Sequence, residues 1–232
     1  MRITEQQLFD YIECPAKYHI KYNMKIDIPE EIHLSKLLNS VSNFFYLNLL
    51  NGKIPTYNQI KKKWDALCEQ YKLDNKKVIT GWGYVLKLIE WCENNKICVA
   101  DVSSNYMISL GEDQLIGNIE TILVTPQKQI ELFYTNFSEK ALDPILIDMK
   151  LKYGLDALGF YTLYNKMPDI QKILSVKYNE VLLTNRTQPD ITRVRDTIQN
   201  VINCIKNNLF YPRESAFCKT CPAKQYCKYW HN

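Results

Sequence analysis

Three of the eight cysteines lie close together at the end of this 232-residue chain, as Cys218-x2-Cys221-x5-Cys227. The first residues contain no apolar stretch of the kind that makes a secretory signal, and no run of about 18 apolar residues predicts a membrane span. We therefore expect a cytoplasmic protein without a membrane partner. Thiols stay reduced inside the cell, so a tight cysteine trio there indicates metal binding rather than disulfides.

Three thiolates need a fourth ligand to complete a four-coordinate site. Cys14 is the favoured candidate, because it follows an amphipathic segment that opens with a Thr4…Gln7 capping box and is stopped by Pro15. The alternative fourth ligand is His231, which would make a small zinc-bound interaction module. The remaining cysteines are scattered on apolar faces and are expected to be inert core thiols: Cys68, Cys92, Cys98 and Cys204.

The two ends of the chain together carry a family resemblance. A Tyr-x-x-Cys-Pro-x-x-Tyr start at residues 11–18, combined with the C-terminal cysteine trio, resembles the iron–sulfur branch of the RecB-like PD-(D/E)XK nucleases. That branch includes CRISPR-associated adaptation exonucleases and AddB-type helicase–nuclease subunits. The resemblance implies a [4Fe–4S] cluster on Cys14, Cys218, Cys221 and Cys227 that closes a nuclease-like core. It also implies DNA as a partner, single-stranded or at duplex ends, with a helicase or integrase-type protein beside it.

The resemblance further implies a hydrolytic centre in which two carboxylates hold Mg2+ or Mn2+ beside a lysine. The first carboxylate would be Glu120, in Gly-Asn-Ile-Glu at residues 117–120. On the following strand the carboxylate and lysine positions hold Phe133 and Thr135, which cannot bind a hard cation or supply a charge. Glu131 shares a face with Phe133 but comes two residues too early. This alignment predicts a catalytically inactive, DNA-binding or scaffolding protein.

A second alignment leaves an active enzyme open. Asp148-Met149-Lys150 is a literal Asp-x-Lys, and residues 145–147 before it could end a strand. Glu120, Asp148 and Lys150 would then form the triad of a metal-dependent DNA exonuclease. Apolar residues at helical spacing from Ile147 onward favour a helix there instead.

The elements expected to position these residues change in type along the chain. Helical periodicity covers residues 32–50, 57–71 and 76–93, which makes residues 1–100 a helical N-terminal lobe. Short strands at 106–110, 115–124 and 129–135 predict an antiparallel meander. A helix from Asp143 to about Lys166 and a strand at 173–183 complete a mixed sheet over residues 101–190. A helix near 190–207 and the cysteine segment fill residues 191–232. The expected fold is α/β, with one PD-(D/E)XK-like domain.

Composition sets the outer limits of these interpretations. An apolar content of 46% excludes a disordered chain, and the length excludes a disulfide-stapled miniprotein. A net charge of +4 permits nucleic acid as a partner without requiring it. The densest basic run, Lys61-Lys62-Lys63, is the candidate phosphate contact.

Overall fold

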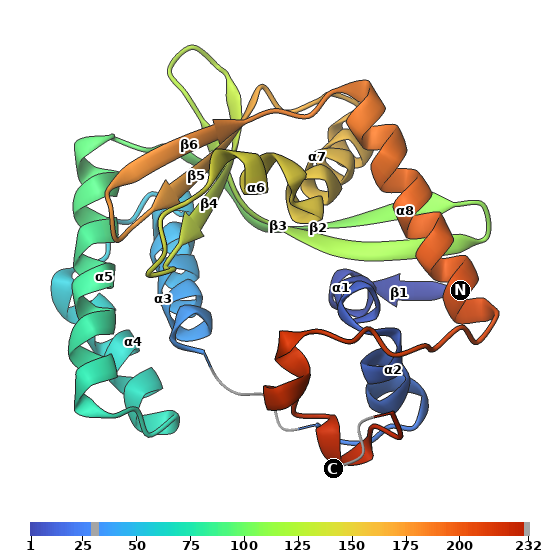
Figure 1. Ribbon diagram of the computed structural model, residues 1–232. Helices are drawn as coiled ribbons and strands as arrows, with labels where there is room; N and C mark the ends of the chain where they lie inside the picture. Colours follow the sequence, from blue (N-terminus) through green and yellow to red (C-terminus); the bar gives the residue numbers. More distant parts are fainter. Residues whose placement is uncertain (29–32, 230–232) are drawn as a thin grey trace. The chain divides into compact units, whose positions relative to one another are not determined.

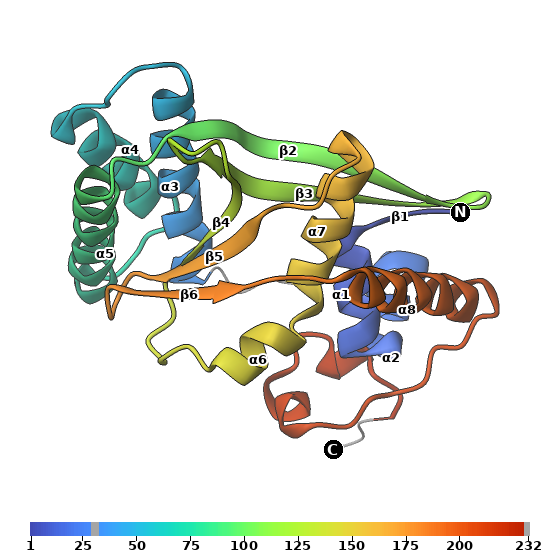
Figure 2. The same cartoon turned by 90° about the horizontal axis from the view of Figure 1, so that it is seen from above.

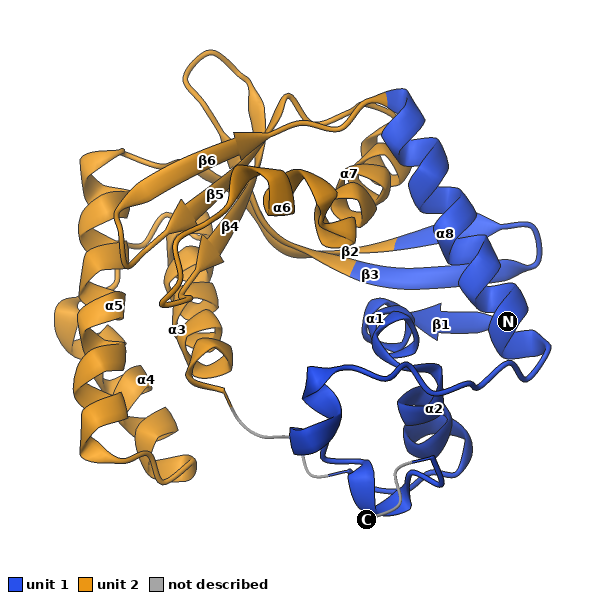
Figure 3. Ribbon diagram, viewed as in Figure 1, with its two compact units in different colours: residues 1–31, 107–117, 188–232 blue, residues 32–106, 118–187 orange. Residues whose placement is uncertain are grey.

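The computed structural model describes residues 1–28 and 33–229, and these fall into two compact units (Figure 3). Unit 1 comprises residues 1–31, 107–117 and 188–232, and unit 2 comprises residues 32–106 and 118–187. Two long strands, β2 (Val99–Leu110) and β3 (Asp113–Val124), contribute residues to both units. In the part of the chain that is described, no helix is long and apolar enough to cross a bilayer.

Unit 1 is built around the two chain ends. A short strand, β1 (Arg2–Thr4), pairs in parallel with β3, with Ile3 opposite Leu115. Helix α1 (Glu5–Glu13) follows, and its expected Thr4–Gln7 capping box is present. After Cys14 come α2 (Pro15–Tyr18) and a π-helical turn at His19–Asn23. The long helix α8 (Gln188–Lys206) leads to a C-terminal segment with two 3-10 turns, at Ala216–Thr220 and Lys224–Tyr226.

The helices of unit 2 confirm the three predicted for residues 32–50, 57–71 and 76–93, whereas residues 1–31 of the predicted helical lobe belong to unit 1. The three helices are α3 (Leu34–Leu50), α4 (Tyr57–Gln70) and α5 (Asn75–Asn94), which lie together beside the strands at residues 130–136, 170–175 and 180–184 in Figures 1 and 2. Their apolar faces meet in one core in which Trp64 is fully buried. The same core includes Phe133 and Leu174 from the sheet, so the lobe and the strands of unit 2 fold as one body.

The sheet of unit 2 is mixed, as expected. β3 pairs antiparallel with β4 (Ile130–Asn136), β4 pairs parallel with β5 (Ile170–Ser175), and β5 pairs antiparallel with β6 (Glu180–Thr184). The single strand predicted for residues 173–183 is wrong, because a turn at residues 176–179 splits it into a hairpin. Asn179 has a φ of 54°, a left-handed conformation that asparagine tolerates better than most residues.

The long helix predicted from Asp143 to Lys166 is also interrupted. It consists of α6 (Pro144–Met149) and α7 (Leu151–Tyr164), and Lys150 between them is extended, with φ −67° and ψ 120°. The apolar periodicity continues across the break, which is why the sequence pattern conceals it. Asn165, at φ 51°, ends α7 in a left-handed conformation.

Gly159 allows α7 to approach strand β2 closely. A Cβ atom at this position would stand 2.4 Å from the ring of Tyr106, which is itself buried. Gly159→Ala is therefore expected to lower the free energy of unfolding by about 1–3 kcal/mol through overpacking. Gly83→Ala in α5 is the matched control, because nothing lies within 4 Å of its Cβ and alanine is the better helix former. Chemical denaturation of both variants measures the difference, and equal stability would contradict the close contact.

Candidate functional sites

The first candidate site lies in unit 1, where the chain turns at Cys14. This residue ends α1 and begins α2 in an extended conformation, with φ −160°. Two hydrogen bonds hold the C-terminal segment against this turn: Arg213 Nη1 donates to the carbonyl of Ile12 at 2.7 Å, and Ala16 N donates to the carbonyl of Tyr211 at 3.1 Å. Both chain ends therefore meet at the turn that carries Cys14.

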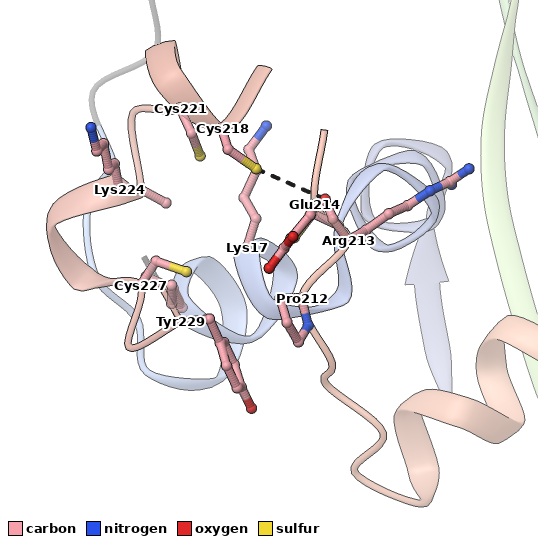
Figure 4. A pocket seen from close by; sticks show the side chains of 12 residues that line it. Lys17, Pro212, Arg213, Glu214, Cys218, Cys221, Lys224, Cys227 and Tyr229 are labelled. Carbon is pink, nitrogen blue, oxygen red and sulfur yellow. Dashed lines mark hydrogen bonds between the residues drawn. The ribbon is translucent and has the colours of Figure 1, made fainter. Parts of the chain in front are cut away.

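The four predicted cysteines line one pocket, as Figure 4 illustrates for Cys218, Cys221 and Cys227. All four are half-buried. The backbone N–H of Ser215 donates to the Cys218 sulfur at 3.4 Å. Among the described residues, no three His, Cys, Asp or Glu side chains are close enough together to hold a single metal ion.

The chemistry of the pocket is that of soft sulfur ligands with nearby cations. Burial raises the pKa of Cys221, while the positive charge of Lys17 acts in the opposite direction and the neighbouring Cys14 and Cys218 raise it further. An all-cysteine donor set suits zinc or an iron–sulfur cluster and does not suit Mg2+ or Ca2+. The alternative ligand His231 lies outside the described residues.

The second candidate site is a polar pocket in unit 2 that contains Glu120. Thr135 from β4 lines the same pocket, and its hydroxyl lies 3.3 Å from that of Tyr46 on α3. The other lining residues are amides and hydroxyls: Asn39, Ser42, Asn43, Ser103, Asn118 and Thr121. Among the described residues lining this pocket, Glu120 is the single carboxylate. Hard divalent cations prefer several carboxylate oxygens, so the pocket is poorly equipped to hold one.

Phe133 stands in the strand position expected for the second carboxylate, and it belongs to the core. Its ring stacks on Trp91 with centroids 5.3 Å apart and meets Tyr46 edge-on at 6.0 Å. The side chain is 1% exposed. Glu131, two residues earlier, is engaged by Lys172 of β5 at 2.6 Å. Phe133 has no carboxylate, and Glu131 does not line the pocket of Glu120.

Asp148 and Lys150 do not lie on a strand, so the alternative alignment that ended a strand at residues 145–147 is wrong for this segment. Asp143 caps α6 by accepting from the backbone N–H of Ile145 at 2.9 Å, and a proline at the first helical position favours the helix. The Asp148 carboxylate accepts from Thr184 Oγ1 at 2.6 Å, and the Lys150 ammonium lies 6.0 Å from the centroid of the Tyr153 ring. Neither residue is among those described as lining the pocket of Glu120.

A buried polar network beside Glu120 was missed in the sequence. Lys152 Nζ donates to Asp156 Oδ1 at 2.7 Å and to the Asn118 carbonyl at 2.9 Å, and Asp156 is fully buried. Burial raises the pKa of Tyr134 well above its usual value, and the charges of Asp156 and Glu120 raise it further. The signal in the sequence was a Lys–Asp pair at i,i+4, a spacing that usually marks an exposed helix face.

The basic run Lys61–Lys63 lies on α4 at the surface of unit 2. Lys61 pairs with Asp65 and its ammonium also lies 5.4 Å from the centroid of the Trp82 ring. Lys62 is exposed and Lys63 is half-buried. The run therefore presents positive charge to solvent, although one of its members is already paired.

Comparison with known proteins identifies a fold. No family model and no curated protein matches the sequence. The crystal structure of a protein described as a "putative exonuclease" from Eubacterium rectale matches with a TM-score of 0.57 at 11% identity, covering 94% of this chain and 86% of that one. A second structure, that of SSO0001, matches with a TM-score of 0.40 at 12% identity over 98% of this chain and 95% of that one, a score too low to indicate a shared fold. The chain thus shares the fold of the protein described as a putative exonuclease.

Proposed function

We propose that this chain is a nuclease-like protein without a working nuclease centre, which binds DNA or serves as a scaffold in a DNA-processing complex. The observation that carries the proposal is the place of Phe133. Its ring is packed between Trp91 and Tyr46, at the chain position where the family resemblance expects the second metal-binding carboxylate, and among the described residues no carboxylate besides Glu120 lines the pocket of Glu120. The family resemblance would make this pocket the hydrolytic site, but neutral hydroxyls and amides surround the carboxylate.

The four cysteines around the first pocket would hold a [4Fe–4S] cluster. Cys14 would be the ligand from the N-terminal turn, and Cys218, Cys221 and Cys227 would be the ligands from the C-terminal segment. The support is the all-sulfur donor set, gathered in one pocket from two distant stretches of chain. When bound, the cluster supplies a cross-link between the chain ends. The family resemblance implies a helicase or integrase-type protein partner, and the cross-linked chain ends would give that partner a rigid surface to bind.

A nuclease assay tests the absence of activity. With Mn2+ and either single-stranded or duplex DNA, we expect the wild-type protein to release no more nucleotide than the Glu120→Gln variant. Glutamine keeps the shape of the side chain and removes the charge that a metal would need. Asp148→Asn is the second comparison. Mn2+-dependent cleavage by the wild type that either substitution abolishes would overturn the proposal.

DNA binding is tested at the basic run on α4. Changing Lys61, Lys62 and Lys63 together to glutamine is expected to weaken single-stranded DNA binding in fluorescence anisotropy titrations. If all three contact phosphates, the slope of log affinity against log salt should fall by about 2, at roughly 0.7 for each contact. A triple change of the exposed Lys72, Lys76 and Lys77 removes the same net charge from another surface of unit 2. Equal losses in the two triple variants would argue against a specific contact at α4.

A further inference from the structure

A large groove in unit 1 adjoins the cysteine pocket. It is lined by His19 and Met24 from the N-terminal region, Phe210 and Tyr211 after α8, and Tyr226 in the cysteine segment, with Lys228 and Tyr229 beyond. Its volume is about 800 Å3. Small-molecule pockets usually measure about 300–1,000 Å3. The groove therefore lies in the upper part of that range.

Aromatic rings in this groove are presented to solvent. Tyr211, Tyr226 and Tyr229 are 57%, 42% and 45% exposed. The imidazole of His19 stacks on Phe210 with centroids 4.6 Å apart. Flat faces that remain accessible beside a groove are suited to stacking against planar ligands.

His19 contributes two further features. Its Nδ1 atom is buried and has no hydrogen-bond partner among the described residues. It is also the first residue of the π-helical turn His19–Asn23. Such turns are rare in proteins, and those that occur are often at functional sites.

The basic excess of the chain is concentrated around this groove. The lining residues come from two stretches, 14–25 and 208–229, which contain seven lysines and arginines and one acidic residue, Glu214. They therefore carry a net charge of +6, while the rest of the chain is slightly acidic, since the whole chain carries +4. Lys228 lines the groove itself, and two of the other lysines, Lys17 and Lys21, are paired with Glu13 and Asp10. A ligand with a polyanionic backbone and planar bases matches both the charge and the aromatic faces.

We propose that this groove binds single-stranded DNA, with unpaired bases stacked on Tyr211 and Tyr226 and phosphates facing the surrounding lysines. The inference rests on the proposed DNA-binding function and gives it a place and a ligand class. Single strands are favoured over duplex because bases within a duplex are already stacked and do not offer their faces.

Anisotropy titrations with two labelled strands of about 12 nucleotides test the stacking, because that length spans an ordinary single-strand site. One strand is oligothymidine, and the other has the same backbone with abasic residues in the middle. The wild type is expected to bind the complete strand about tenfold or more tightly than the abasic one. Tyr211→Ala combined with Tyr226→Ala should remove that preference, whereas the two Tyr→Phe changes, which keep the rings, should preserve it.

Tyr164→Ala, at a tyrosine that is 50% exposed on α7, is the matched control and should bind both strands as the wild type does. Bound iron, followed by visible absorbance, is measured for each variant to separate loss of stacking from damage to the cysteine pocket.

If the double alanine variant still prefers the complete strand, the groove is not the base-binding site. The broader DNA-binding proposal survives if that binding depends on Lys61–Lys63 instead. If the wild-type protein binds no DNA, both proposals fail. A groove substitution that changes only the oligomeric state would show that a second copy of the chain occupies the groove, and would overturn the inference.

Discussion

Replacing Phe133 with alanine is expected to lower the free energy of unfolding by about 3–5 kcal/mol. The ring is almost completely buried and contacts Trp91 and Tyr46, two large side chains of the same core that cannot both move to fill the space. Urea unfolding of the wild type and of Phe133→Ala measures the change. Ile79→Ala, at a helix position that is 72% exposed, is the control and should stay within about 0.5 kcal/mol of the wild type.

The same packing decides whether a nuclease centre can be restored. A glutamate at position 133 would place a carboxylate among aromatic rings, and an unpaired buried charge is strongly unfavourable. Phe133→Glu with Thr135→Lys is therefore expected to be unstable rather than to regain Mn2+-dependent cleavage. An unchanged urea midpoint for Phe133→Ala would show that the Phe133 ring does not stabilise the core. A stable and active double variant would show that position 133 can accept a metal-binding carboxylate.

Removing one cysteine of the first pocket is expected to release the C-terminal segment. In Cys221→Ser, we expect loss of most of the bound iron and of the visible absorbance, together with rapid proteolysis within residues 208–229. The physical reason is the small apolar core beneath this segment, which consists of Ile20, Ile28 and Ala223 with partly buried neighbours. Because so little apolar surface is buried there, ligand bonds would have to supply much of the stability.

The control for this experiment is Cys98→Ser. The prediction that Cys98 is a core thiol is wrong, because its side chain is exposed, and it is far from the pocket in the sequence. Purification without oxygen and metal analysis distinguish iron from zinc. A Cys221→Ser protein that retained the absorbance and the protease resistance of the wild type would contradict the cluster proposal. Zinc at full occupancy, without iron, would favour the interaction-module alternative instead.

The sequence alone was sufficient for the features that depend on neighbouring residues. Capping at Thr4–Gln7 and the apolar stripes of α3, α4 and α5 placed those helices within one or two residues at their described ends. The antiparallel pairing of β3 with β4 followed from the short turn between them. Spacing and residue type also selected the four cysteines that line one pocket, although what they bind stays a prediction.

Other features depended on contacts between distant residues, and only the tertiary structure decided them. The apolar periodicity predicted a continuous helix through Lys150, where the backbone is in fact extended. It also predicted one strand where the structure has the two antiparallel strands β5 and β6. The i,i+4 spacing of Lys152 and Asp156 is typical of an exposed helix face, but in the structure Asp156 is fully buried and Lys152 donates to the Asn118 carbonyl of β3. Whether Glu120 faces Asp148 or Thr135 depended on how β4 and α6 pack, and in the structure it shares its pocket with Thr135. A pattern of residue types records which side chains are apolar, whereas long-range packing determines which of them meet.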